Sequence, residues 1–393
     1  NAEFTKPNKY QTSPLPNALD TSLKQAFELL RDATKPVILA GGGIKNNGDE
    51  ATKHLLALAE IVNAPCATSP GHGDLIPFNH PLNAGSAGPR GSGIGTQLLK
   101  EADVILVLGS RLGFNTTFYS YENINKNAAI IHCELDENSI GRYFPVAVEI
   151  FCDAVAVSKQ LYQMFKDHKA KAEVAEWTTQ FQESRKKYLE ARDHDADVTS
   201  VPIMPSGLFK QLRHSIPKDA AITLDAGTMC LQLTDALNFY QTKSLFTPLD
   251  FGLVGFSYPA GLGIKLAAPE RPVISFHGDG GMSMVIPELS TAIENNINTV
   301  TCVMNNGTWG AEAAYQKDFF DGRFIGAHIT TPEFDKVAEL YGCKGIKVEK
   351  ANEIGDAIQA GLEAECPTVI DVKCSPDALY SFRQDSFKHK VKQ

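Results

Sequence analysis

The sequence lacks any apolar run long enough to cross a membrane. Stretches such as Val104–Leu108 fall far short of the roughly 20 residues that a bilayer-spanning helix requires. The opening residues, NAEFTKPNKY, contain no apolar core of the kind found in secretory signals. We therefore expect a cytoplasmic protein that has no membrane partner.

Positive charge and cysteine motifs are also scarce. The chain has 37 Lys and Arg against 46 Asp and Glu, a net charge of -9, so we expect no nucleic acid partner. No two cysteines form a CxxC pair, and several lie inside apolar stretches, which predicts reduced core residues rather than disulfides or a metal cluster. The eight cysteines are Cys66, Cys133, Cys152, Cys230, Cys302, Cys343, Cys366 and Cys374.

What the sequence does contain is two rounds of apolar strands alternating with amphipathic helices. Its 393 residues are enough for two or three domains. Continuous apolar runs such as VILAGGG and DVILVLG, separated by helices, are typical of parallel sheets covered on both faces. We predict an α/β fold of two doubly wound parallel-sheet domains.

Composition divides the chain into three parts. Residues 1–165 are predicted to form a Rossmann-like domain, and residues 201–393 a second α/β domain with a C-terminal tail. The highly charged residues 166–200 predict a solvated helical connector, in which Trp177, Phe181 and Tyr188 could share one helix face. The second domain is expected to open with a helix that has Ser206 as its N-cap.

Three predicted strands of the second half end in polar turns that contain glycine: Asp-Ala-Gly-Thr, Gly-Asp-Gly-Gly and Asn-Asn-Gly-Thr. Parallel sheets bind ligands beyond the carboxyl ends of their strands, so we predict a site here. The Asp279 carboxylate, the Asn306 amide and the Thr308 backbone carbonyl are oxygen ligands of the kind that Mg²⁺ prefers. Glycine at 278, 280 and 281 would let the backbone approach a phosphate, aided by a helix starting near Met282–Pro287.

Each turn alone is a common loop motif. Together, the Gly-Asp-Gly and Asn-Asn turns resemble the thiamin diphosphate-binding signature of the pyruvate oxidase and acetolactate synthase superfamily, and FGLVGFSYPAGLGIKLAAPERPVISFHGDGGMSMVIPEL is similar to it through most of its length. The resemblance implies thiamin diphosphate and Mg²⁺ as cofactors, with Asp279, Asn306 and Thr308 as metal ligands. It implies that the first half is the family's central domain. The implied cofactor-binding residues are Ala226, Gly227, Thr228, Gly252, Val254, Gly278, Asp279, Gly280, Gly281, Asn306, Thr308, Trp309 and Gly310.

Within this superfamily, NNGTWGAEAAYQKDFFDGRFIG, AGSAGPRGS and SFRQDSFKHKV are most similar to the sulfoacetaldehyde acetyltransferases. That resemblance implies conversion of sulfoacetaldehyde and phosphate to acetyl phosphate and sulfite, in a homodimer or tetramer. Arg90, Arg323 and Arg383 are candidates for binding the substrate anions, and each could instead form a surface ion pair. Two alternatives stay open: a 2-oxo acid decarboxylase or carboligase of acetolactate synthase type, and a non-catalytic nucleotide-binding or regulatory subunit.

The sequence departs from the family in two ways. Relatives begin with a pyrimidine-binding domain whose glutamate activates the cofactor, and no counterpart is visible, so we expect a processed fragment or one subunit of a split enzyme. The catalytic residue is accordingly unknown, and a pyrimidine-binding domain or subunit is an expected partner. The segment GSRLGFNTTF stands where flavin-binding relatives have an Arg-rich run, so no FAD is expected.

Other polar motifs carry weaker signals. GSGIG at 91–95 precedes a helix rather than following a buried strand, which makes it a poor dinucleotide fingerprint. His72 and His80 are interpreted as structural or solvated loop residues, and His277 as a packed strand residue rather than a base.

Overall fold

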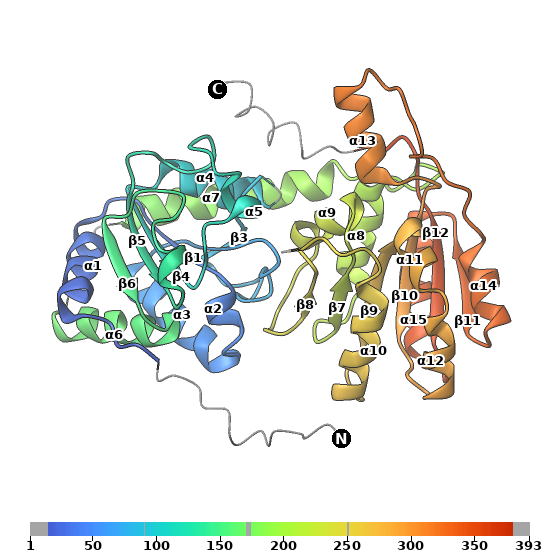
Figure 1. The fold of residues 1–393 in the computed structure, drawn as a ribbon, viewed down its shortest axis with the longest axis horizontal. Helices are drawn as coiled ribbons and strands as arrows, with labels where there is room; N and C mark the ends of the chain where they lie inside the picture. The colour runs from blue at the N-terminus through green and yellow to red at the C-terminus, as the bar shows by residue number, and fades with distance from the viewer. Residues whose placement is uncertain (1–14, 90, 170–173, 250, 380–393) are drawn as a thin grey trace, which may run out of the picture.

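The computed structural model describes residues 15–89, 91–169, 174–249 and 251–379. Two six-stranded sheets, each parallel throughout, lie side by side (Figure 1). Their strand orders are β3-β2-β1-β4-β5-β6 and β11-β12-β10-β9-β7-β8, which confirms the predicted pair of doubly wound α/β units. Within the described ranges, no helix combines the length and apolarity needed to cross a membrane. All eight cysteines are free and all but Cys366 are buried, as predicted.

The first sheet is buried on both faces. Every residue of β1 and β4 is buried, because α1, α3 and α6 pack on one face while α4 and the later α7 pack on the other. The strands are β1 (Pro36–Ala40), β2 (Cys66–Thr68), β3 (Asn83–Ser86), β4 (Val104–Leu108), β5 (Ala129–Glu134) and β6 (Val148–Phe151). The helices are α1 (Asp20–Asp32), α2 (Gly42–Lys45), α3 (Asp49–Val62), α4 (Gly93–Glu101), α5 (Phe114–Thr117) and α6 (Ala154–Asp167), with a 3₁₀ turn at Glu137–Ser139.

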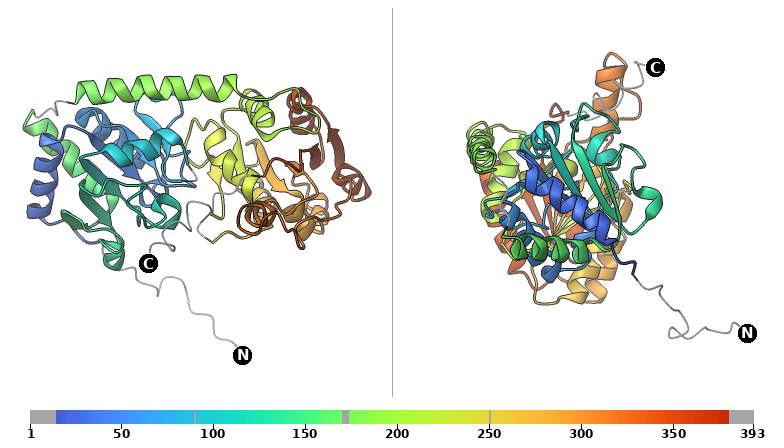
Figure 2. Two further views of the ribbon diagram at one scale, coloured as in Figure 1. Left: turned by 90° about the horizontal axis from the view of Figure 1, so that it is seen from above. Right: turned by 90° about the vertical axis from the view of Figure 1, so that its left-hand side faces the viewer.

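The charged connector contains α7 (Ala175–His194), and it is less solvated than its composition predicts. Trp177 and Phe181 are buried in the core of the first sheet, where the Trp177 Nε1–H donates to the Pro36 carbonyl at 3.1 Å. Farther along, the Tyr188 hydroxyl donates to Asp235 of the second half at 2.6 Å. The helix therefore packs along the first sheet and reaches toward the second (Figure 2).

The second sheet has the same layered construction. Helices α8, α9 and α15 cover one face, and α10, α11, α12 and α14 cover the other. The strands are β7 (Ala221–Leu224), β8 (Leu245–Phe246), β9 (Val273–Gly278), β10 (Val300–Asn305), β11 (Lys344–Val348) and β12 (Thr368–Lys373). The helices are α8 (Pro205–Ser215), α9 (Thr228–Ala236), α10 (Ser257–Ala267), α11 (Asp279–Val285), α12 (Glu288–Glu294), α13 (Gly310–Phe319), α14 (Phe334–Leu340) and α15 (Ile354–Leu362), with a 3₁₀ turn at Ala351–Glu353.

Two predicted helix starts are wrong. Helix α8 begins at Pro205 with Met204 in the N-cap position, because proline is well suited to a first helical residue whose N–H needs no partner. The Ser206 hydroxyl instead accepts a hydrogen bond from the Asp197 N–H at 3.2 Å. Helix α11 begins at Asp279 rather than near Met282, so the acidic residue lies in its first turn.

The first half holds the edge strand of the second sheet. The buried Asp74 accepts hydrogen bonds from the N–H groups of Ser244 and Leu245 at 2.9 and 3.0 Å, and Lys45 pairs with Asp74 at 2.8 Å. The Asn115 amide also donates to the Leu249 carbonyl at 3.0 Å. These contacts fasten β8 and the loop after it, which forms one wall of the cavity described below.

Candidate cofactor-binding site

A cavity of about 240 Å³ lies at the carboxyl end of the second sheet. Strand β9 pairs with both β7 and β10, so the three polar turns predicted from the sequence are neighbours in space. Every residue that the sequence predicts to contact a cofactor lines this cavity: Ala226, Gly227, Thr228, Gly252, Val254, Gly278, Asp279, Gly280, Gly281, Asn306, Thr308, Trp309 and Gly310.

Asp279 connects two of the strand ends. Its Oδ1 accepts the Gly280 N–H at 2.8 Å, while Oδ2 accepts the N–H groups of Asn306, Gly307 and Thr308 at 3.2, 2.6 and 3.3 Å. Burial raises the pKa of Asp279, and the four backbone N–H groups oppose that shift. A cation bound at this carboxylate would favour its ionised form, as those N–H groups do.

The two adjacent asparagines differ in how their side chains are satisfied. The Asn305 amide donates to Asp371 at 3.0 Å and its Oδ1 accepts the Thr331 hydroxyl at 2.9 Å. The Asn306 Oδ1 is buried and has no hydrogen-bond partner among the described residues. A buried acceptor left unpaired costs about 1–3 kcal/mol, which a bound cation would offset. Asn305 therefore anchors the strand end, whereas Asn306 offers an oxygen.

This donor set fits a hard cation. Residues 15–89, 91–169, 174–249 and 251–379 contain no group of three His, Cys, Asp or Glu side chains able to hold a metal ion. An ion beside Asp279 would therefore depend on the Asn306 amide oxygen and on backbone oxygens such as that of Thr308, a set suited to Mg²⁺ rather than Zn²⁺.

Two glycines of the Gly-Asp-Gly-Gly turn are required by close packing. A Cβ at Gly280 would lie 2.6 Å from the Trp309 ring, and one at Gly281 would lie 2.2 Å from the Asp225 carboxylate. Because no side chain fits at either position, the turn can pack directly against Trp309 and Asp225 only with glycine there.

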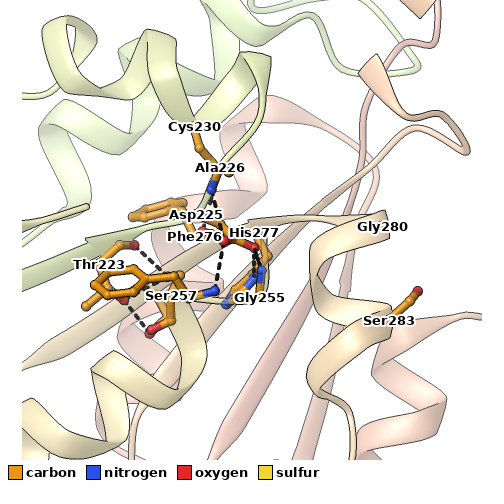
Figure 3. A network of polar contacts seen from close by, with 12 residues as sticks. Thr223, Asp225, Ala226, Cys230, Gly255, Ser257, Phe276, His277, Gly280 and Ser283 are labelled. Carbon is orange, nitrogen blue, oxygen red and sulfur yellow. Dashed lines mark hydrogen bonds and ion pairs between the residues drawn. The ribbon is translucent and has the colours of Figure 1, made fainter. Parts of the chain in front are cut away.

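Asp225, at the end of β7, was not singled out in the sequence. Its carboxylate is fully buried and accepts four hydrogen bonds, from Ala226 N–H, Gly255 N–H, Phe256 N–H and the ring of His277, at 2.8 to 3.0 Å (Figure 3). The only signal for it was an acidic residue directly after a buried strand. Further lining residues that were not anticipated are Met229, Leu231, Gln232, Thr247, Leu249, Glu312 and Ala378.

The histidines lie outside the cavity lining. His277 is a buried residue of β9, and its Nε2 has no partner among the described residues. His80 has an ion-pairing neighbour that the sequence did not reveal, Glu60, at 3.1 Å. The His72 ring lies 3.1 Å from the Pro70 carbonyl in the first half.

The structure does not bring Arg323 into the cavity. Its side chain is exposed, donates to the Phe320 carbonyl at 3.0 Å and lies 3.9 Å from Asp321. Arg90 and Arg383 lie outside the described residues. No described lysine, arginine or histidine lines the cavity.

Comparisons with known proteins match both halves of the chain. The model for "Thiamine pyrophosphate enzyme, C-terminal TPP binding domain" matches residues 225–372, and that for "Thiamine pyrophosphate enzyme, central domain" matches residues 23–161.

Among curated proteins, the sulfoacetaldehyde acetyltransferase of Alcaligenes xylosoxydans xylosoxydans is 31% identical over 95% of this chain and 66% of its own length. That of Castellaniella defragrans is 30% identical over 96% and 68%. A probable acetolactate synthase large subunit of Methanococcus aeolicus is 31% identical over 91% and 61%. The chain thus spans about two thirds of the length of these relatives.

Proposed function

The chain belongs to the thiamine pyrophosphate enzyme family, and on that premise we propose that it binds thiamin diphosphate with Mg²⁺ at the carboxyl end of its second sheet. The observation that carries this proposal is the buried Asn306 Oδ1, which has no partner among the described residues, in a glycine-lined cavity that Asp279 also lines. Asp279, Asn306 and the Thr308 carbonyl would hold the metal.

The remaining lining residues divide into two groups by chemistry. The turns at 226–228 and 278–281, with Trp309 and Gly310, would surround the diphosphate through backbone N–H groups. Val254, Leu231 and Leu249 supply apolar walls that would orient the thiazolium ring and exclude water. When bound, thiamin diphosphate supplies a nucleophilic carbon that attacks carbonyl groups.

The acid that activates the cofactor is proposed to come from a pyrimidine-binding domain or subunit, within a homodimer or tetramer. This proposal is supported by the two buried carboxylates of the cavity, which already accept hydrogen bonds from the protein. Asp225 and Asp279 each accept four hydrogen bonds. Of the described acidic residues that line the cavity, this leaves only Glu312, whose side chain is exposed.

For the reaction, we propose that sulfoacetaldehyde and phosphate are converted to acetyl phosphate and sulfite. The sulfoacetaldehyde acetyltransferases among the relatives support this choice. The alternative, a 2-oxo acid decarboxylase or carboligase of acetolactate synthase type, is supported by the similarly distant acetolactate synthase relative. Arg90, Arg383 or a residue of another chain would supply the cationic group for the substrate anions, and the described lining contains no lysine, arginine or histidine.

A substrate panel separates these reactions. The full enzyme, supplied with Mg²⁺ and thiamin diphosphate, is given sulfoacetaldehyde or pyruvate, each with and without phosphate. Phosphate-dependent release of sulfite and acetyl phosphate is the expected result. Pyruvate consumption that needs no phosphate would establish the alternative, and cofactor binding without turnover of either substrate would indicate a non-catalytic subunit.

A further inference from the structure

The Asp225 carboxylate joins three segments that form walls of the cavity. Its Oδ1 accepts the N–H groups of Ala226 and Phe256 at 2.9 and 3.0 Å. Its Oδ2 accepts the Gly255 N–H at 3.0 Å and the His277 Nδ1–H at 2.8 Å (Figure 3). One buried side chain thus links the turn after β7, the loop that carries Val254, and the strand that leads into the Gly-Asp-Gly-Gly turn.

The hydrogen bond from His277 has a defined direction. An ionised carboxylate can only accept, so Nδ1 must carry the hydrogen. In the neutral imidazole, Nε2 is then an acceptor, and it is buried without a partner among the described residues. An apolar residue would fill this position without that unpaired atom. The interaction that a histidine adds here is the bond to Asp225.

The surrounding packing makes this arrangement rigid. Directly beneath the carboxylate, the Ser257 hydroxyl donates to the Thr223 carbonyl at 2.9 Å, and the Thr223 hydroxyl donates to that of Ser275 at 2.8 Å. These bonds fix the start of α10 onto β7 and β9. On the other side, the missing side chain of Gly281 lets the turn pack directly on Asp225.

We infer that Asp225 and His277 are positioning residues, which hold the Val254 loop and the Gly278–Gly281 turn at the separation that the cofactor requires. This role rests on the proposed cofactor site. The Asp225 carboxylate is occupied by four hydrogen bonds and His277 does not line the cavity, so both act through the backbone segments that they hold. The geometry assigns Asp225 as the acceptor that gathers the segments and His277 as the donor that orients it.

The test compares His277→Asn with His277→Leu in the full enzyme. The Asn side-chain amide nitrogen can occupy the place of Nδ1 and keep the donor, whereas Leu has similar bulk and no donor. Calorimetric titration with Mg²⁺ and thiamin diphosphate, followed also by Trp309 fluorescence, gives the dissociation constant without any need for turnover. His277→Leu is expected to weaken cofactor binding by roughly 10-fold or more, as is typical when a residue that orients the ligand-contacting groups is lost. His277→Asn is expected to keep most of the affinity.

His132→Leu is the matched control, since His132 is a buried histidine in β5 of the other sheet and its Nε2–H donates to the Ser110 carbonyl at 2.8 Å. Both Leu variants should lose thermal stability, but only His277→Leu should lose cofactor affinity. Unchanged affinity in His277→Leu, or equal losses in the two Leu variants, would overturn the inference while leaving the cofactor site intact. If the wild-type enzyme binds no cofactor, the proposed function fails and the inference falls with it.

Discussion

Replacing Asp279 by Asn should abolish Mg²⁺-dependent stabilisation by thiamin diphosphate. The change keeps the shape of the side chain but removes the full charge from a cavity that Asn306 also lines. It also exchanges one acceptor oxygen for an NH₂ group, which would face either the Gly280 N–H or the three N–H groups of residues 306–308. Of the three described residues proposed to hold the divalent cation, Asp279 is the only one with a charged side chain, and the substitution removes that charge.

The size of the effect follows from mass action. A ligand supplied at 100 times its dissociation constant stabilises the folded state by about 2.7 kcal/mol. For a domain of this size, each kcal/mol raises the melting temperature by about 2–4 °C, so the wild-type enzyme should gain roughly 5–10 °C. Asp279→Asn should gain nothing under the same conditions.

A thermal melt with and without Mg²⁺ and thiamin diphosphate measures this difference, and calorimetry confirms it at constant temperature. The apo melting temperature of Asp279→Asn serves as the control for folding. If the variant folds and the cofactor still raises its melting temperature as much as in the wild type, Asp279 is not a ligand of the metal, and the assignment of the site is wrong.

The remaining predictions concern other residues. Asn305→Ala should lower the free energy of unfolding by about 1–3 kcal/mol in urea denaturation, because the buried Asp371 Oδ1 loses its donor. Asn306→Ala should not lower it, because the Asn306 Oδ1 has no partner among the described residues, but should weaken cofactor binding in calorimetry. Burial raises the pKa of Asp235, so its contribution to stability is present below its usual pKa and is lost as pH rises through the raised value. Asp235→Asn should remove that part of the pH dependence measured by urea unfolding. Arg323→Lys should leave the KM for phosphate unchanged, because the side chain is exposed and outside the cavity.

The fold and the place of the candidate site could be predicted because both depend on local patterns. Apolar strands that are buried on both faces are visible as continuous runs, and parallel pairing brings their carboxyl ends to one edge. Asp279 and Asn306 directly follow two such strands, so their proximity could be predicted without knowledge of side-chain contacts. The family membership inferred from the same residues is confirmed.

The misses have a common physical cause, which is tertiary contact. The sequence placed Trp177 and Phe181 on one face of α7, but the surrounding charges predicted a solvated helix, and only packing on the first sheet buries that face. Asp225 is one acidic residue among many until the loop at 255–256 and the ring of His277 converge on it. Arg323 follows the Asn-Asn turn closely in the sequence, yet it points into solvent.

The Asn306 Oδ1 and the His277 Nε2 are two of the buried polar atoms that have no partner among the described residues, and they have different explanations. Buried polar groups are usually hydrogen-bonded, so each unpaired one calls for an explanation of its own. Asn306 lines the cavity, whereas His277 does not. The free nitrogen of His277 is instead the consequence of directing the other ring nitrogen at Asp225. The position relative to the cavity therefore distinguishes Asn306, which is proposed to contact the ligand, from His277, which is proposed to hold the contacting groups in place.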